Sequence, residues 1–196
     1  MMGGVSTDIA DAVRAHMHAW LGGPEPQAAS VTFLGLEPVE VLRFNAGGGV
    51  RFVTAGCARH PMTAAGDAIA DPVGGPRAEL VLELRAGAHP PGVHRVLAVL
   101  AAAPAVEGLV LQADALLDLS EPLWAGVPFT AVLLGPSDIP ELPLDAPAEP
   151  VHFLAVAPVT ATEAAWVRVR GADALRKAWQ EAGIDIRDPQ RPAAAL

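Results

Sequence analysis

The chain has 196 residues, of which 52% are hydrophobic and 18% charged, so it can bury a large core and is not intrinsically disordered. Its formal net charge of -9, without any cluster of Lys or Arg, disfavours generic binding to nucleic acid. Its only cysteine, Cys57, excludes an intrachain disulfide, and we expect one domain over residues 1–196.

The N-terminal segment, residues 1–30, is predicted to form a helix followed by a linker. Its apolar residues recur at helical spacing, and Gly22-Gly23-Pro24 ends the pattern. Asp8 and Asp11 stand where a signal peptide would carry positive charge, and the longest uncharged stretch, residues 122–137, is interrupted by proline and glycine. We therefore expect a soluble, cytoplasmic protein without a membrane partner.

Three apolar runs follow, at residues 31–36, 39–44 and 50–54, and each is predicted to be a strand. Residues 45–49 join the last two and are rich in glycine, which adopts positive φ without strain, so they predict a hairpin loop. A loop that cradles phosphate would lead from a strand into a helix, whereas this loop leads into another strand.

Residues 56–77 form a long irregular segment rich in Gly, Pro and Asp, and loops of this length are often functional or mobile. The alternation over residues 78–85 then predicts a strand with leucines on one face and Glu79, Val81 and Glu83 on the other. The two glutamates would share a face, which permits a paired-carboxylate site, but a solvated strand face is the favoured interpretation.

A second helix is predicted to begin after Pro90-Pro91-Gly92 and to end at Pro104, because proline is tolerated at a helix start and not inside one. Residues 108–113 and 129–134 are predicted to be strands. Residues 115–118 between them fit either a helical turn or an extended edge.

Residues 138–150 are rich in proline and acidic residues and predict a surface loop. Residues 151–156 have few polar interruptions and predict a central strand of the sheet. Thr160 and Glu163 then match a capping box, in which the threonine hydroxyl and the glutamate each accept a backbone N–H of the other residue. This motif predicts a helix that ends near Gly171.

One more helix is predicted up to Gly183, and residues 186–196 are expected to be frayed. Strands and helices in this order neither alternate strictly nor segregate fully. They predict an α+β fold, with a mixed, mostly antiparallel central sheet of about six to seven strands and helices packed on it.

The motifs of familiar catalytic and metal sites are absent from the sequence. It contains no H-E-x-x-H or C-x-x-C, and no serine sits in a G-x-S-x-G turn. A metal site assembled from residues distant in sequence stays open. We expect a protein that is not an enzyme and that carries no cofactor and no metal.

Three separated blocks together resemble the suppressor of fused-like domains. The first, Val53-Thr54-Ala55-Gly56-Cys57-Ala58, is similar to that family's strand-to-turn segment, and the second, at residues 78–84, to its Glu-Leu strand. The third joins the strand at residues 151–156 to Thr160-x-x-Glu163, Gly171 and Leu175. Two departures from the family pattern are Ala58, where a serine is usual, and Cys57, where Met or Leu is frequent.

The resemblance implies a bacterial, stand-alone member of the family that acts as a protein-binding module. Animal members bind zinc-finger transcription factors of the Gli type, and some bacterial members are linked to toxin–immunity systems. We expect an acidic protein of this kind to bind another protein, with a basic toxin as one such partner. The candidate partner-binding residues are Thr54, Gly56, Arg59, His60, Met62 and Glu79, and the structural motif is Thr160, Glu163 and Gly171.

An alternative function stays open from the residues alone. Residues 56–77 could serve as the lid of a small-molecule-binding protein or enzyme, with Arg59 and His60 placed to bind an anion.

Overall fold

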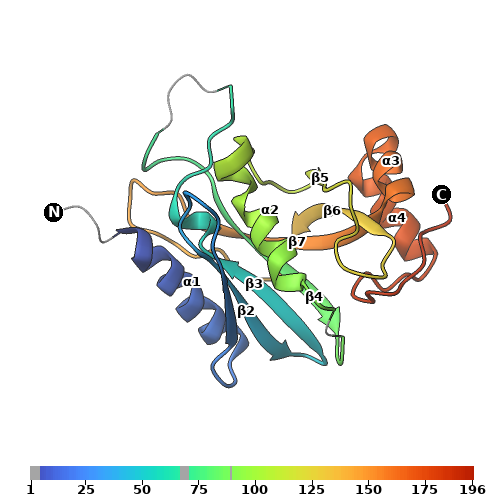
Figure 1. Cartoon of the computed structure of the whole chain (residues 1–196), viewed down its shortest axis with the longest axis horizontal. Helices are drawn as coiled ribbons and strands as arrows, with labels where there is room; N and C mark the ends of the chain where they lie inside the picture. Colours follow the sequence, from blue (N-terminus) through green and yellow to red (C-terminus); the bar gives the residue numbers. More distant parts are fainter. Residues whose placement is uncertain (1–4, 67–70, 89) are drawn as a thin grey trace.

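The computed structural model describes residues 5–66, 71–88 and 90–196, and its strands form one mixed sheet with helices on both faces (Figure 1). Within these residues the sheet has seven strands in the order β1-β2-β3-β4-β7-β6-β5. β4 and β7 pair in parallel, and the other neighbours pair antiparallel. The predicted α+β class with a mixed, mostly antiparallel sheet is confirmed.

The strands are β1 (Gln27–Val31), β2 (Val39–Ala46), β3 (Gly49–Ala55), β4 (Arg77–Arg85), β5 (Leu116–Asp118), β6 (Phe129–Pro136) and β7 (Val151–Thr160). The helices are α1 (Val5–Leu21), α2 (Val93–Glu107), α3 (Ala161–Arg170) and α4 (Ala172–Glu181), and a 3-10 turn, η1 (Cys57–Arg59), follows β3. The predicted end of the second helix at Pro104 is wrong, because α2 continues through this proline to Glu107.

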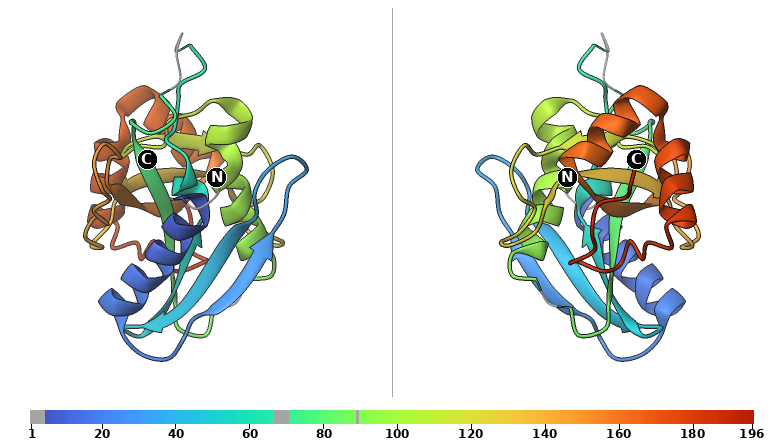
Figure 2. Two further views of the ribbon diagram at one scale, coloured as in Figure 1. Left: turned by 90° about the vertical axis from the view of Figure 1, so that its left-hand side faces the viewer. Right: turned by 90° about the vertical axis from the view of Figure 1, so that its right-hand side faces the viewer.

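The alternation of side chains along the central strands divides the core between two faces. On β7, Leu154 and Val156 pack in the cluster that contains α2, whereas Phe153 packs with α1 and Val159 with α3 and α4. α2 therefore covers one face of the sheet, and α1 covers the other face together with the α3–α4 pair, as the two side views show (Figure 2). β7 pairs with β4 on one side and with β6 on the other, so the prediction of a central strand is confirmed.

Two predicted strands are wrong. The run at residues 31–36 ends as a turn, in which Leu36 N–H donates to the carbonyl of Phe33 and Gly35 has a φ of 81°, and the strand lies earlier, at β1. Residues 108–113 lie in no strand, and Gly108 at their start accepts from Ala65 N–H in the loop after η1. The ambiguous residues 115–118 are extended and contain β5.

The capping box predicted at the start of α3 is confirmed. Glu163 N–H donates to Thr160 Oγ1 at 3.2 Å, and Thr160 N–H donates to Glu163 Oε2 at 2.9 Å. Gly171, with a φ of 85°, separates α3 from α4 in the backbone region that favours glycine. The structural role predicted for these three residues therefore matches their geometry.

The expectation of a frayed C-terminal tail is wrong. Arg191 and Ala194 are only 3% and 7% exposed, and both bond to the buried carboxylate of Glu163. The guanidinium of Arg191 donates to both carboxylate oxygens, at 2.8 and 2.9 Å, and lies over the rings of Phe129 and Trp179. The tail is thus fastened to the start of α3 by a buried ion pair.

Candidate partner-binding site

The turn η1 is anchored on a buried carboxylate. Glu79 on β4 is 0% exposed, and its oxygens accept from the backbone N–H groups of Gly56, Cys57 and Ala58 at 2.8, 3.3 and 3.0 Å. Thr54 Oγ1 donates to the same carboxylate at 2.6 Å and accepts from a β4 N–H. A carboxylate at the first N–H groups of a helical turn satisfies donors that lack partners within the turn.

Arg77, two residues earlier on β4, holds the opposite end of the same turn. Its guanidinium is buried and donates to the carbonyls of Ala58 and Arg59 at 2.7 and 2.9 Å, and to that of Val73 at 3.1 Å. A carboxyl group that accepts hydrogen bonds thus lies at the N–H end of η1 and a guanidinium that donates them lies at its carbonyl end, in the sense that the peptide dipoles favour. β4 therefore fixes the position of η1 from both sides.

This arrangement corrects two of the residues predicted to contact a partner. Thr54 and Glu79 are both 0% exposed, so neither presents a side chain to another protein. From the alternation of β4, the face that carries Glu79 is predicted to be solvated. This prediction is wrong, because η1 folds over that face and donates hydrogen bonds to the carboxylate. Both residues position the site instead of forming its surface.

The buried Glu79 predicts a pH dependence of stability. Burial raises the pKa of Glu79 from 4.5 to about 7, against the opposing effect of the donors from Thr54, Ala58, Gly56 and Cys57. The folded protein then keeps a proton that the unfolded chain has already released, so the contribution of Glu79 to stability is full below pH 4.5 and is lost as pH rises through about 7. The expected loss is at most about 3 kcal/mol. Denaturant unfolding at pH 5, 6, 7 and 8 measures it.

Glu79→Gln is the control for this dependence, because glutamine does not titrate. Other perturbed carboxyl groups act at lower pH: the Arg187 guanidinium beside Asp185 lowers the pKa of that carboxyl to about 2. The difference between the two pH profiles above pH 5 therefore reports Glu79. Parallel profiles would show that Glu79 is ionised throughout this range in the folded protein.

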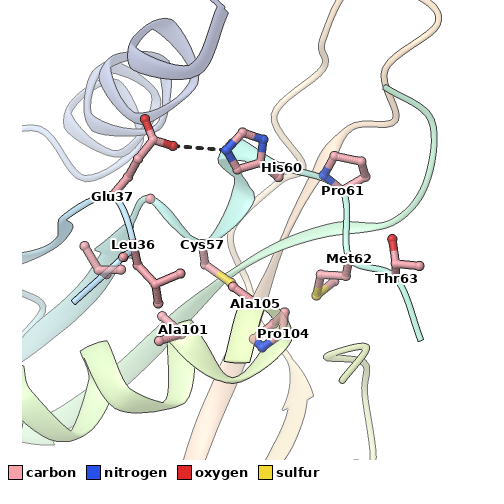
Figure 3. Close-up of a pocket in the computed structure, with 14 residues that line it drawn as sticks. Leu36, Glu37, Cys57, His60, Pro61, Met62, Thr63, Ala101, Pro104 and Ala105 are labelled. Carbon is pink, nitrogen blue, oxygen red and sulfur yellow. Dashed lines mark hydrogen bonds and ion pairs between the residues drawn. The ribbon is translucent and has the colours of Figure 1, made fainter. Parts of the chain in front are cut away.

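A cavity of about 380 Å³ opens beside η1, between the β1–β2 loop and α2 (Figure 3). Its walls come from four parts of the chain that are distant in sequence. They are the β1–β2 loop with the start of β2 (Gly35, Leu36, Glu37, Val39), η1 with the preceding glycine (Gly56, Cys57), the following segment (His60, Pro61, Met62, Thr63) and the C-terminal half of α2 (Ala101, Ala102, Pro104, Ala105).

The floor of this cavity is apolar and its rim is polar. Val39, Met62, Ala101 and Ala102 are each buried, whereas His60 Nε2 lies 3.0 Å from a carboxylate oxygen of Glu37 in an exposed pair (Figure 3). Such a cavity can receive an apolar side chain of a partner and bond to polar groups beside it.

Cys57 and Gly56 shape the wall near η1. Burial, and after it the charge of Glu79, raises the pKa of the Cys57 thiol well above 9.0, so this residue is a poor nucleophile at neutral pH. Gly56 has a φ of 137°, and a Cβ there would come within 2.8 Å of the Arg59 guanidinium. The turn between β3 and η1 thus requires glycine.

The structure brings together three of the residues predicted to contact a partner. Gly56, His60 and Met62 line the cavity, whereas Arg59 donates from its guanidinium to the carbonyl of Pro38. The sequence reasoning missed the walls formed by Leu36 with Glu37 and by the end of α2. Residues 67–70 of the expected lid lie outside the described residues, so the structure leaves that alternative untested.

No metal centre or membrane span adds to this site in the described part of the chain. Residues 5–66, 71–88 and 90–196 contain no group of three or more His, Cys, Asp or Glu side chains that could hold a metal ion. None of the helices described there is both long and apolar enough to cross a bilayer.

Comparison with known families gives the identity of the domain. A model of the family described as suppressor of fused protein (SUFU) matches residues 35–192. The chain belongs to the suppressor of fused family. The matched region runs from the β1–β2 loop to the buried tail, so it includes the cavity and every wall around it. No match was found among curated proteins.

Solved structures share the suppressor of fused fold across nearly the whole chain. A protein described as a SUFU homologue from Neisseria gonorrhoeae has a TM-score of 0.73 at 17% identity, with 97% of this chain and 98% of that one covered. A chain of the Sufu–Fu complex has a TM-score of 0.65 at 14% identity, with 97% and 91% covered. Drosophila Suppressor of Fused has a TM-score of 0.66 at 14% identity, with 95% of this chain and 51% of that one covered.

Proposed function

We propose that this suppressor of fused domain is a protein-binding module that has no catalytic activity of its own. The observation that carries the proposal is the family match over residues 35–192. A relative with the same fold is named as part of a protein complex, the Sufu–Fu complex, which supports a partner that is itself a protein. The poor nucleophilicity of Cys57, the cysteine that lines the cavity, also supports binding over catalysis.

The cavity beside η1 is the surface that we assign to the partner. Leu34, next in sequence to the cavity wall at Gly35, is 106% exposed, and Val106, next to Ala105 of α2, is 65% exposed. Exposed apolar side chains in the segments that form an apolar cavity can extend a protein interface beyond the cavity itself. η1 is held by buried bonds to β4, so this surface is largely formed before a partner arrives.

Leu34→Glu is expected to weaken partner binding at least tenfold while leaving the fold intact, because the new charge would have to be desolvated in the interface. The measurement uses the immobilised wild-type domain to capture a protein from the native host in stoichiometric amount. The affinity of that purified protein for the wild-type domain and for the variant is then compared by calorimetry.

Val169→Glu is the matched control, since Val169 is also an exposed apolar side chain, at 79%, and it belongs to α3, which packs on the opposite face of the sheet. It should bind the partner as the wild type does. Capture of no protein at low and at moderate salt would count against the proposed function. Equal weakening by both variants would place the interface elsewhere.

A role as an immunity protein that neutralises a basic toxin stays a prediction within this proposal. The net charge of -9 would speed the encounter with a basic protein through long-range attraction. The identity of the captured protein decides between a toxin and another partner, and cell fractionation tests the expected cytoplasmic location.

A further inference from the structure

We propose that the outer edge of β1 pairs with β1 of a second copy of this chain, so that two sheets join into one across a two-fold axis. This inference goes beyond the proposed function, because it concerns association of the domain with itself and uses none of the residues that line the cavity. It follows from the different character of the two edges of the sheet and from the sequence of β1.

The two edges of the sheet are protected to different degrees. β5, at one edge, has three residues and ends in Asp118, whose carboxylate pairs with Arg168 of α3 at 2.5 Å. Short strands and charged side chains are usual means by which a sheet edge avoids pairing with another chain. β1, at the other edge, has five residues, and none of them is charged or a proline. The β1 edge therefore lacks the protection that the β5 edge has.

The outer side of β1 can receive a further strand. Within the described residues β1 pairs only with β2, so alternate residues of the strand direct their N–H and C=O groups away from the sheet. Val31 packs in the cluster that contains α2 on one face, whereas Ala28 and Ser30 on the other face are exposed. The strand lies at the border of the molecule in both side views (Figure 2). A strand added there would form main-chain hydrogen bonds with these outward groups.

The sequence of β1 suits a second copy of itself. In an antiparallel pair centred on Ala29, the two Ala29 residues lie opposite each other and Ala28 lies opposite Ser30 of the other copy. These facing side chains are small and uncharged, whereas a charged strand paired with itself would bring like charges together. Residues 26–36 contain no charged side chain, although the chain carries a net charge of -9. Two copies can therefore meet at this edge with little repulsion between the facing side chains.

Charge exchange across the pair tests this inference. In sedimentation equilibrium the wild-type chain is expected to pass from monomer to dimer between micromolar and millimolar concentration. The double variant Ala28→Lys with Ser30→Lys places a lysine opposite a lysine twice in the pair, so it should weaken the dimer about tenfold. The double variant Ala28→Glu with Ser30→Glu should behave in the same way. An equimolar mixture of the two variants should form a mixed dimer, because each lysine then faces a glutamate.

A cysteine at the centre of the pair gives a second test that adds no charge. With Cys57 replaced by alanine, Ala29→Cys sets two cysteines directly opposite, with Cα atoms about 4.5–5.5 Å apart, which a disulfide can span. Mild oxidation with diamide should therefore give a covalent dimer. Ala28→Cys is the matched control, because its two cysteines would lie diagonally, at a Cα separation of about 8 Å that a disulfide does not span. Equal cross-linking of the two variants would contradict the pairing.

The charge control is Ala165→Lys with Ala182→Lys, which adds two lysines at exposed positions of α3 and at the end of α4, far from β1 along the sheet order. This variant should dimerise as the wild type does. A wild-type chain that stays monomeric up to millimolar concentration, a dimer that the β1 lysines do not weaken, or a mixture without the mixed dimer would each overturn the inference. None of these outcomes bears on the capture of a partner, which Leu34→Glu tests separately.

Discussion

Replacing Glu79 with alanine is expected to lower the free energy of unfolding by about 4 kcal/mol, because it leaves several buried donors without an acceptor. The N–H groups of Gly56, Cys57 and Ala58 and the hydroxyl of Thr54 all donate to this carboxylate. Each buried donor that loses its partner costs about 1–3 kcal/mol, and the partial relaxation of η1 limits the sum. Equilibrium unfolding in urea at pH 7 measures the change.

Glu83→Ala on the same strand is the control for Glu79→Ala. Glu83 lies four residues further along β4 and forms ion pairs with Arg51 and Arg187 near the surface, at 30% side-chain exposure. Pairs of this kind contribute about 0–1 kcal/mol. Similar losses in the two variants would show that the bonds to η1 contribute no more than a surface ion pair does.

Glu79→Ala should also loosen the cavity, because Gly56 and Cys57 form one of its walls. The variant is therefore expected to bind the partner more weakly even under conditions in which most molecules are folded. This second effect distinguishes a residue that positions the site from one that only contributes to the core.

Replacing Arg191 with alanine is expected to cost about 4 kcal/mol of unfolding free energy, since it leaves the carboxylate of Glu163 buried without its counter-charge. The pair is 2% and 0% exposed. Burial alone would raise the pKa of Glu163, but hydrogen bonds keep it below 4.5, and they come from Arg191, Thr160, Trp179 and Ala194. The Glu163 carboxylate is therefore ionised at neutral pH. Urea unfolding and hydrogen exchange of the α3 amides measure the loss.

Arg187→Ala is the matched control for Arg191→Ala, because Arg187 is in the same tail and is 45% exposed in pairs with Asp185 and Glu83. It should cost less than about 1 kcal/mol. Arg191→Lys keeps the charge but loses the paired bonds to both carboxylate oxygens, so it should fall between the two. Equal effects of Arg187→Ala and Arg191→Ala would mean that the tail does not fasten α3.

Features encoded by neighbouring residues could be predicted from the sequence. The capping box of Thr160 and Glu163 spans four positions, and the central strand β7 follows from a local run of apolar residues. The same Glu163 illustrates the limit, because its strongest partner, Arg191, lies 28 positions away. No local pattern marks that ion pair, so residues 186–196 were expected to be frayed.

The candidate site was predictable only in part for the same reason. Residues 56–62 carry a glycine turn followed by polar and apolar residues, which drew attention to Gly56, His60 and Met62. The facing walls at Leu36 with Glu37 and at Ala101 with Pro104 have no motif of their own. They join the site because the sheet places the β1–β2 loop and α2 beside η1, and such long-range contacts are set by tertiary packing.

The parallel pairing of β4 with β7 has a consequence for how the chain folds. β1 to β4 form successive antiparallel neighbours and can assemble while the chain is short, but β4 has no partner on its other side until residues 151–160 are available. Closing so long a loop is slow, and the exposed edge of β4 is open to wrong pairing until then. We therefore expect the rate-limiting step of folding to be the arrival of β7, and nascent chains that stop before it to aggregate.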